Sequence, residues 1–500
     1  MRRREFLGSS IAASVALSLP ARVVLAADTS STPQLPAQIP AVTGGGVATT
    51  LTRSDLQALQ RSLRGPLYLA GDAGYELSRR VEDRSIDRHP ALIVQPSGAA
   101  DVRTAVTFAR EHSLLLAVKC GGHSQTGQST CNGGMQIDLA RVRGVRVDPA
   151  AHLAYVAGGS LLGDLDHEAM ACGLVTTAGT VSHTGVGGLT LGGGFGRLAR
   201  RFGLALDNVT AVDIVTADGE YRHASATENP ELFWGVRGGG GNFGVVTSFE
   251  FALHPMRRQV VSGNVVFPIS RLRELLLAYG DISAHAPAEL YMDGIVSASP
   301  GKDTVFVISV CYSGPAERAE QALAPIRKLG TPLADTIEAR DYVAVQRGTD
   351  STDPRVRSEY AMSGLIDRLD AGLTAALVAG FEPDPERRTE IFFQQGGGAI
   401  GKIDSSATAF PHRQASHNMM LVTDWLAGSD ATAHRRYVDR YWKSLQPFTH
   451  GMYVNTMNDD PPAIVEANYA GNLQRLRQLK RRYDPTNLFR LNANIRPGAA

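Results

Sequence analysis

The sequence predicts an α+β protein with two domains, and three observations lead to this fold class. Its 500 residues, 43% of them apolar and 20% charged, are more than one ordinary core accommodates. Residues 91–118 read in order as strand, helix and strand, which is a β-α-β unit. A second region of sheet and helix follows later, with strands expected at 260–266, 290–297 and 304–311 and a helix at 317–328.

The first 26 residues have the features of a twin-arginine export signal. Arg3 and Arg4 precede a modest apolar run at 11–19, and small residues stand near a cleavage position at 24–26. An ordinary basic leader for the unfolded-chain pathway is the alternative. Because the twin-arginine route carries folded proteins, we expect a chain that folds in the cytoplasm and ends in the periplasm or outside the cell.

Residues 27–50 and the overall charge set further limits. Residues 27–50 are rich in Ser, Thr, Pro and Gly and read as a flexible linker. The formal charge of +1 falls to −2 when the segment 1–26 is removed, so nucleic acid is not expected as a partner. No stretch suits a permanent membrane span, so no membrane association is expected after signal removal.

The β-α-β unit ends in a loop that is the first candidate binding site. An apolar strand at 91–95 stops before Pro96, apolar residues recur at helical spacing over 101–112, and a second strand follows at 114–118. The loop 118–127 (VKCGGHSQTG) therefore lies at the carboxyl end of a strand, where open α/β structures usually bind ligands. Its glycines let bare N–H groups approach a phosphate. Further strands are expected at 134–139 and 152–157.

Two more glycine-rich stretches follow. Residues 179–196 contain eight glycines among eighteen residues. So few side chains leave bare backbone on which a flat or charged ligand can lie. Residues 237–244 (RGGGGNFG) include a formal G-x-G-x-x-G, but the β-branched and aromatic run at 245–251 predicts a strand after it, whereas a dinucleotide fold needs a helix there. A nicotinamide cofactor is therefore disfavoured, and the phosphate-loop motif of nucleotide triphosphatases is missing from the sequence.

The four cysteines indicate neither a disulfide framework nor a metal site. Cys120, Cys131, Cys172 and Cys311 are too few for a chain of this length, and their spacings match no zinc motif. We expect no metal. A bridge between Cys120 and Cys131 is conceivable, and the sequence leaves that question open.

Four motifs together resemble the berberine bridge enzyme-like flavin oxidases of the vanillyl-alcohol oxidase and p-cresol methylhydroxylase group. They are GGHS at 121–124, the stretch 179–196, LFWGVRGGGGNFGVVTSFEF at 232–251 and YDPTNLFRLNANI at 483–495. The resemblance implies a two-part flavin-binding domain with an inserted antiparallel-sheet substrate domain. The implied boundaries are 51–255 for the FAD-binding domain, 256–464 for the substrate domain and 465–500 for the segment that returns to the FAD-binding domain.

The resemblance also implies FAD held covalently through His123. Some relatives add a second link from a cysteine, but that position is Val181 here, so one bond is expected. Backbone amides of the 121–127 loop would take the pyrophosphate, and the second glycine stretch would line the ring. The expected cofactor-binding residues are His123, Gly121, Gly122, Ser124, Gln125, Gly127, Gly179, Thr180, Thr184, Gly185, Gly188, Gly193, Val246, Asn492 and Asn494.

The catalytic base is less clearly marked. Tyr453 lies where relatives show Tyr-x-Asn-Tyr, but the second tyrosine of that motif is Thr456 here, which puts the usual tyrosine chemistry in doubt. Tyr453 and Tyr360 are the expected catalytic residues, and for each a packed aromatic with a satisfied hydroxyl is an equally good interpretation. The other candidates are Gln394, His412 and His417, and a structural role is favoured for His412.

The resemblance implies an exported FAD-dependent oxidase that takes a hydride from a small alcohol, sugar or amine and reduces dioxygen to hydrogen peroxide. The alternative is a flavin dehydrogenase, or a flavin-carrying electron-transfer or binding protein, that uses an acceptor other than oxygen. Thr184 favours the oxidase. It occupies the position where relatives that are oxidases carry valine and dehydrogenases carry leucine, and threonine has the shape of valine.

Overall fold

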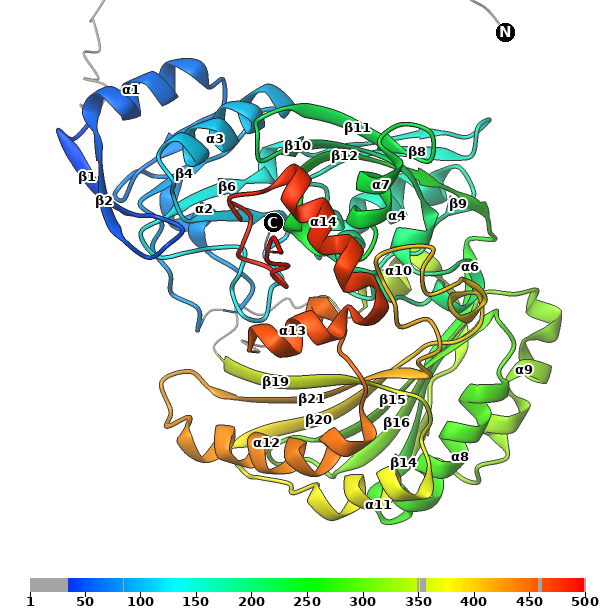
Figure 1. Cartoon of the computed structure of the whole chain (residues 1–500). Helices are drawn as coiled ribbons and strands as arrows, with labels where there is room; N and C mark the ends of the chain where they lie inside the picture. Colours follow the sequence, from blue (N-terminus) through cyan, green and yellow to red (C-terminus); the bar gives the residue numbers. More distant parts are fainter. Residues whose placement is uncertain (1–34, 84, 349, 351–356, 457–460, 499–500) are drawn as a thin grey trace, which may run out of the picture.

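The structure is a computed structural model that describes residues 35–83, 85–348, 350, 357–456 and 461–498. The predicted export signal at 1–26 and the start of the predicted linker lie outside the described residues. Two lobes are visible in Figure 1. The first lobe comprises residues 35–255 together with the tail from 461, and the second lobe comprises residues 256–456. Among the described residues, no helix is long and apolar enough to cross a membrane.

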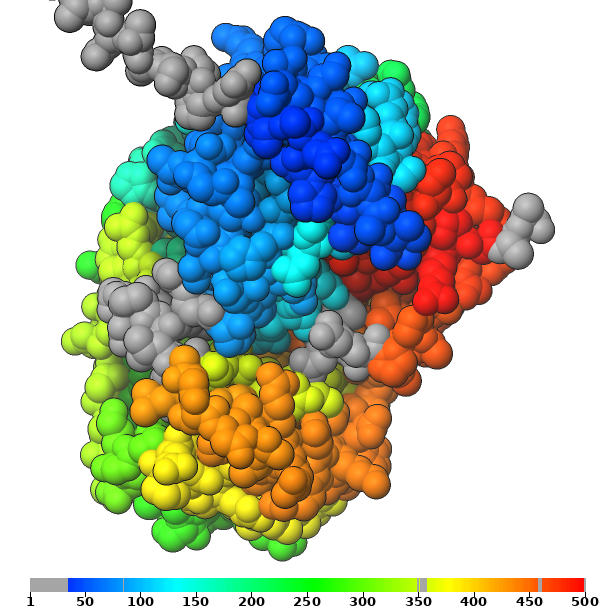
Figure 2. Space-filling model, turned by 90° about the vertical axis from the view of Figure 1, so that its left-hand side faces the viewer, coloured from blue at the N-terminus to red at the C-terminus, as the bar shows by residue number. Residues whose placement is uncertain are grey.

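The linker prediction is wrong for residues 38–50. β1 (Gln38–Val42) and β2 (Ala48–Thr52) form an antiparallel pair that leads into α1 (Arg53–Ser62). Leu51 is fully buried, and the amide of Val42 donates to the carbonyl of Gly133 at 2.8 Å. Buried Ala41 and Leu51 thus anchor this segment to the rest of the first lobe, although its composition is typical of a linker. The segment is dark blue in Figure 2.

The β-α-β unit of the first lobe is confirmed. β4 (Leu92–Val94) and β5 (Leu116–Lys119) both pair in parallel with β6 (Met135–Asp138), and α3 (Ala99–Glu111) connects the first two. The short β3 (Leu67–Tyr68) completes this four-stranded sheet, and α2 (Tyr75–Arg79) lies between β3 and β4 in the chain. The loop 120–127 therefore leaves the carboxyl end of β5, as predicted.

A second sheet of the first lobe has five strands in the order β11-β10-β12-β8-β7. The stretch after the third glycine run is indeed a strand, β12, and no helix follows the formal G-x-G-x-x-G. The glycine-rich helix α5 precedes β10 in the sequence, and the short helix α7 lies between β11 and β12. The strands and helices of this part are β7 (Val145–Asp148), β8 (Leu153–Ala157), α4 (Leu162–Ala171), β9 (Leu174–Val175), α5 (Val186–Gly192), α6 (Ala199–Phe202), β10 (Val209–Thr216), β11 (Tyr221–Ser225), α7 (Pro230–Val236), β12 (Gly244–Ala252) and β13 (His254–Pro255).

The second lobe is built on an eight-stranded antiparallel sheet, with helices covering one face (Figure 1). On β20, Ile391 and Phe393 are fully buried under these helices, so the alternate residue Gln394 faces the first lobe. The elements are β14 (Gln259–Pro268), α8 (Leu272–His285), β15 (Leu290–Ala298), β16 (Val305–Tyr312), α9 (Ala319–Arg327), β17 (Ala334–Asp335), β18 (Glu338–Asp341), α10 (Tyr342–Arg347), β19 (Arg357–Ile366), α11 (Ala371–Gly380), β20 (Arg387–Gln395), β21 (His417–Leu426) and α12 (Thr432–Leu445).

The tail returns to the first lobe through α13 (Pro462–Asn468) and α14 (Leu473–Tyr483), drawn in orange and red in Figure 1. Leu476 and Leu479 of α14 join the core cluster that includes Trp234 of α7. All four cysteines lie in the described part of the chain, and each is a free thiol, so the conceivable Cys120–Cys131 bridge is not formed.

Candidate active site

A cavity of about 370 Å³ brings the sequence motifs together. Its walls come from the 120–129 loop, from 179–195, from 240–246 and from the tail at 489–493. The second lobe contributes Gln394 and the segment 453–456. Segments more than 300 residues apart in the chain therefore share one site, which lies where the two lobes meet.

The first two glycine stretches touch backbone to backbone. A Cβ on Gly121 would lie 2.2 Å from the amide nitrogen of Gly185, and a Cβ on Gly185 would lie 2.3 Å from the amide nitrogen of Gly121. Any side chain at either position would push the two walls apart. Gly122 has φ +73°, a left-handed conformation that favours glycine, and its carbonyl accepts the amide of Glu82 at 2.9 Å.

The end of the second stretch makes room for Tyr453 and Asn455. A Cβ on Gly192 would lie 2.1 Å from Oδ1 of Asn455, and a Cβ on Gly193 would lie 2.9 Å from the ring of Tyr453. Gly193, an expected cofactor-binding residue, lies behind Tyr453 and not in the cavity wall, so its contact with the cofactor stays a prediction.

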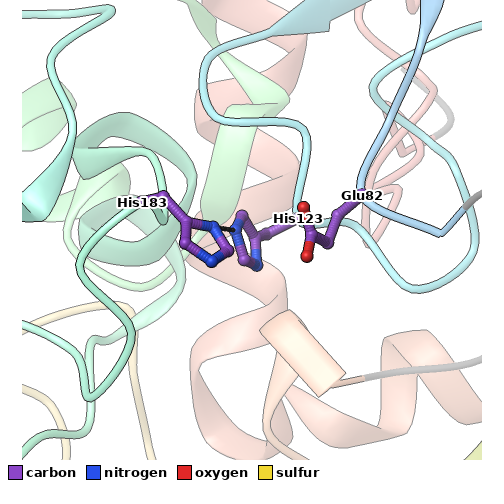
Figure 3. Close-up of side chains that lie close together, drawn as sticks. All are labelled: Glu82, His123 and His183. Carbon is purple, nitrogen blue, oxygen red and sulfur yellow. Dashed lines mark hydrogen bonds between the residues drawn. The ribbon is translucent and has the colours of Figure 1, made fainter. Parts of the chain in front are cut away.

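His123 lies between His183 and Glu82 (Figure 3). Its Nε2 shares a hydrogen bond with Nδ1 of His183 at 2.7 Å, and the rings are tilted by 35°. The three side chains offer nitrogen and oxygen atoms within 4.8 Å of one another, a spacing that a metal ion could also use. The hydrogen bond fixes the orientation of the His123 ring at the wall of the cavity.

Buried polar residues that the sequence reading missed hold the 120–127 loop. Lys119 donates to the carbonyls of Ser78 and Arg80 and lies 3.5 Å from Asp138. These bonds fix the segment that carries Glu82. Burial lowers the pKa of Lys119, while the carboxylate of Asp138 acts in the opposite direction. The sequence signal for this role was a lysine at the end of an apolar strand, two residues before a glycine pair.

The tail motif reaches the cavity through a buried ion pair. Lys480 and Asp484 are fully buried 2.7 Å apart, and Lys480 also donates to the carbonyls of Asn242 and Phe489 at 2.8 and 2.7 Å. Burial lowers the pKa of Lys480 to about 8. Asn242, in the third glycine stretch, donates in turn to the carbonyl of Ala493 at 2.9 Å. The pair thus locks the tail onto the third glycine stretch and places Asn492 in the wall.

Tyr453 presents a buried hydroxyl oxygen surrounded by donors. The amide of Gly194 donates to this oxygen at 2.8 Å, and Nδ2 of Asn455 donates to it at 2.7 Å. These bonds favour the phenolate, but burial acts more strongly and raises the pKa of Tyr453 above its ordinary value. Tyr453 is therefore a protonated phenol near neutral pH, with its oxygen held in place.

Most of the expected cofactor-binding residues line the cavity. Gly127 and Asn494 do not, so their contact with the cofactor stays a prediction. A Cβ on Gly127 would meet Ile86, and the Gly127 carbonyl accepts Nη1 of Arg88 at 2.7 Å, so Gly127 shapes the loop from outside. Those in the wall are His123, Gly121, Gly122, Ser124, Gln125, Gly179, Thr180, Thr184, Gly185, Gly188, Val246 and Asn492.

The candidates for the catalytic base separate clearly. Tyr453 and Gln394 line the cavity. Tyr360 does not: it pairs with Thr423 on the helix-covered face of the sheet, and its hydroxyl donates to Asp439 of α12 at 3.0 Å. The expectation of catalysis by Tyr360 is therefore wrong, because strand alternation turns its side chain away from the first lobe.

Both candidate histidines also lie outside the cavity wall. Nε2 of His412 contacts the backbone carbonyl and Oδ1 of Asn468 at 2.8 and 2.9 Å, which is the structural role favoured for it. His417 is 2% exposed, and burial lowers its pKa to about 3. His417 stays neutral in the core of the second lobe.

The structure adds wall residues that the sequence reading did not select. Gly240 and Gly241 come from the third glycine stretch, whose composition was the available signal, and Val245 comes from β12, the strand that follows it. Asn455 and Thr456 follow Tyr453 in the chain, and the position of the segment where the two lobes meet could not be derived from sequence alone.

The wall fits FAD. Three buried side-chain atoms in it, Oε1 of Gln125, Oγ of Ser129 and Oδ1 of Asn492, have no hydrogen-bond partner among the described residues. Buried polar atoms are rarely left unpaired in folded proteins, so these atoms indicate a polar ligand. The glycine surfaces leave flat backbone for an aromatic ring, and the glycine-containing loop 121–124 is of the kind that binds a diphosphate through its backbone.

Comparison with known families agrees with this geometry. A model described as "FAD binding domain" matches residues 90–225, and one described as "Berberine and berberine like" matches residues 452–496. These two segments contain the 120–127 loop, the second glycine stretch and the tail motif, all of which meet at the cavity.

Individual relatives cover nearly the whole chain. An FAD-linked oxidoreductase of Dictyostelium discoideum is 32% identical over 87% of this chain and 95% of its own length. The (R)-6-hydroxynicotine oxidase of Paenarthrobacter nicotinovorans is 30% identical over 87% of this chain and 97% of its own length. The crystal structure of 6-hydroxy-D-nicotine oxidase from Arthrobacter nicotinovorans superimposes with a TM-score of 0.80 at 27% identity, covering 87% of this chain and 99% of that one. The chain belongs to the berberine bridge enzyme-like family of FAD-linked oxidoreductases.

Proposed function

We propose that this chain is an exported FAD-dependent oxidase that takes a hydride from a small alcohol, sugar or amine and reduces dioxygen to hydrogen peroxide, with its flavin bound covalently through His123. The observation that carries the proposal is that His123 and Tyr453 line the same glycine-walled cavity. FAD, when bound there, supplies the hydride acceptor and passes two electrons to oxygen.

His123 is suited to the covalent link. Its ring is oriented by the 2.7 Å hydrogen bond to His183 at the cavity wall. The imidazole of His123 would bond to the flavin 8-methyl carbon, each would give up one hydrogen, and dioxygen would accept the two electrons released. A covalent link prevents loss of the cofactor outside the cytoplasm, where it is not resupplied.

The phenolate form of Tyr453, which burial makes scarce at neutral pH, is suited to accept the proton that leaves the substrate during hydride transfer. The Gly194 amide and the Asn455 side chain hold its oxygen and stabilise the negative charge that develops when the phenol is deprotonated. Gln394 lies in the same wall, with Oε1 accepting Nδ2 of Asn418 at 2.9 Å, so its amide nitrogen is directed away from Asn418 and can orient a substrate oxygen. The proposal is tested with a panel of alcohols, sugars and amines, read out by flavin bleaching without oxygen and by peroxide release with it.

Thr184 should control the reaction with oxygen. Its backbone is anchored, because the amide of Leu162 donates to its carbonyl at 2.9 Å, and Thr184 lines the cavity. Replacing Thr184 by leucine fills the space that oxygen needs, so we expect stopped-flow reoxidation of the reduced protein to slow roughly tenfold, about 1.4 kcal/mol in barrier.

Thr184→Val is the matched control, since it keeps the shape and should reoxidise at the native rate. If the native protein itself reoxidises slowly and yields no peroxide, the alternative holds, namely a dehydrogenase or electron-transfer protein with another acceptor. An unchanged rate in Thr184→Leu would show that this position does not gate oxygen.

Export should depend on the paired arginines. Changing Arg3 and Arg4 to lysine keeps the charge but removes the guanidinium pair that the twin-arginine receptor reads, so the protein should accumulate in the cytoplasm. Cell fractionation with immunoblotting measures this, and Arg22→Lys in the same segment serves as the control. Continued export of the double variant would point to the unfolded-chain pathway.

A further inference from the structure

Helix α10 belongs to the second lobe in sequence but packs against the first. Tyr342 is fully buried and Val343 is 6% exposed, and both join a cluster with Met170 of α4 and Leu198. Asp341 caps the start of the helix, because its side chain accepts the amide of Ala344. The second lobe thus inserts a rigid element beside the 179–184 wall of the cavity.

The side chain of Gln346 on α10 makes hydrogen bonds with three residues of the first lobe. The side chain is 1% exposed. Its Nε2 donates to the carbonyl of Gly179 at 2.8 Å and to Oδ2 of Asp166 at 3.1 Å, and its Oε1 accepts Nη1 of Arg197 at 2.7 Å. An amide that is fully engaged in this way, at a buried position, holds its partners in one arrangement.

These bonds tie down successive residues of the cavity wall from behind. Gly179 and Thr180 line the cavity, and Arg197 also donates to the carbonyl of Thr180 at 3.0 Å. A third tie comes from Asp350, which accepts the amide and the hydroxyl of Ser182 at 2.7 and 2.5 Å. The wall from 179 to 182 is therefore held by groups that include two residues of the second lobe.

Opposing effects act on the pKa of Asp166, the buried carboxyl group that Gln346 contacts. Burial raises the pKa of Asp166 to about 7, and the hydrogen bond from Gln346 and the charges of Arg197 and Arg347 act in the opposite direction. The phenol of Tyr342 is the other titratable group beside it. Gln346 therefore also helps to keep a buried carboxylate ionised.

We propose that Gln346 is a positioning residue for the flavin: by holding the Gly179 carbonyl and Arg197 it keeps the cavity wall turned so that backbone carbonyls point away from the cofactor. The inference rests on the proposed function, since it assumes a flavin ring at this wall. If the Gly179 carbonyl were released, its negative end could turn into the cavity, where it would disfavour the electron-rich reduced flavin.

Gln346→Met tests this, because methionine keeps the shape and removes all three hydrogen bonds. We expect the visible absorption spectrum of the bound FAD to change and its midpoint potential to fall. Flavin reduction at saturating substrate should slow roughly tenfold, in line with the loss of one to two hydrogen bonds, while KM changes less than about twofold. Gln321→Met, at an exposed glutamine of α9, is the matched control and should behave like the native protein.

A native spectrum and a native potential in Gln346→Met would overturn the proposal, as would a slower reaction caused only by a raised KM. If Gln346→Met does not fold, Gln346→Glu combined with Asp166→Asn keeps the contact with Arg197, puts no second carboxylate beside residue 346, cannot donate to Gly179 when ionised, and gives the same readouts. If the native protein oxidises no substrate, the proposed function fails, but the spectrum and the potential of the bound FAD still decide the role of Gln346.

Discussion

In the His123→Ala variant, FAD should be extractable from the protein, whereas the native protein should keep it after denaturation. His123 is the histidine of the 120–127 loop that lines the cavity, and its ring is held against His183. The measurement is acid precipitation, followed by flavin fluorescence of the washed pellet and by the intact mass of the protein. The native mass should exceed that of the polypeptide by one FAD.

His167→Ala is the matched control, because His167 is an exposed histidine of α4, a helix next to the same wall, and lies outside the cavity. This variant should keep a fluorescent pellet. The fold of His123→Ala should survive, since its loop is held by Lys119 and by the Gly121–Gly185 contact. The covalent bond between His123 and FAD would be contradicted by a colourless native pellet with all FAD in the supernatant. It would also be contradicted by a His123→Ala protein that keeps FAD after denaturation.

Tyr453→Phe should slow flavin reduction by roughly 10²-fold, the size expected when general-base assistance is lost. Phenylalanine keeps the ring that packs against Phe195 and removes the oxygen that Gly194 and Asn455 hold. Because burial raises the pKa of Tyr453 above its ordinary value of 10.0, the phenolate is scarce at neutral pH and becomes more abundant as pH rises. The reduction rate of the native protein should therefore climb across the alkaline range, and Tyr453→Phe should lack this climb.

Tyr360→Phe is the internal control, because its hydroxyl contacts Asp439 on the far face of the sheet. It should change the rate by less than about twofold. A loss below about threefold in Tyr453→Phe, or an equal loss in Tyr360→Phe, would remove Tyr453 from the role. Gln394, Asn455 and Thr456 would then be the remaining polar residues that the second lobe contributes to the cavity wall.

The sequence could predict the fold class and much of the first-lobe wall because the signals involved are local. Two backbone segments can touch only where glycine leaves no side chain between them, so the glycine-rich stretches that contain Gly121 and Gly185 predict such a contact from sequence. Periodicity placed the β-α-β unit and the strand after the third glycine stretch for the same reason. Composition failed at residues 38–50, where strand pairing and the burial of Ala41, followed by Leu51, outweigh many polar neighbours.

Residue spacing along the chain thus determined which segments are strands, helices and glycine loops, and where a histidine follows a glycine pair. Only the tertiary structure decided which side chains meet. Strand alternation combined with helix coverage turns Gln394 into the cavity and Tyr360 out of it, and the buried Lys480–Asp484 pair places Asn492 beside a loop more than 360 residues earlier. Such contacts depend on the packing of whole elements, because a side chain's partners are set by the face it presents and not by its neighbours in sequence.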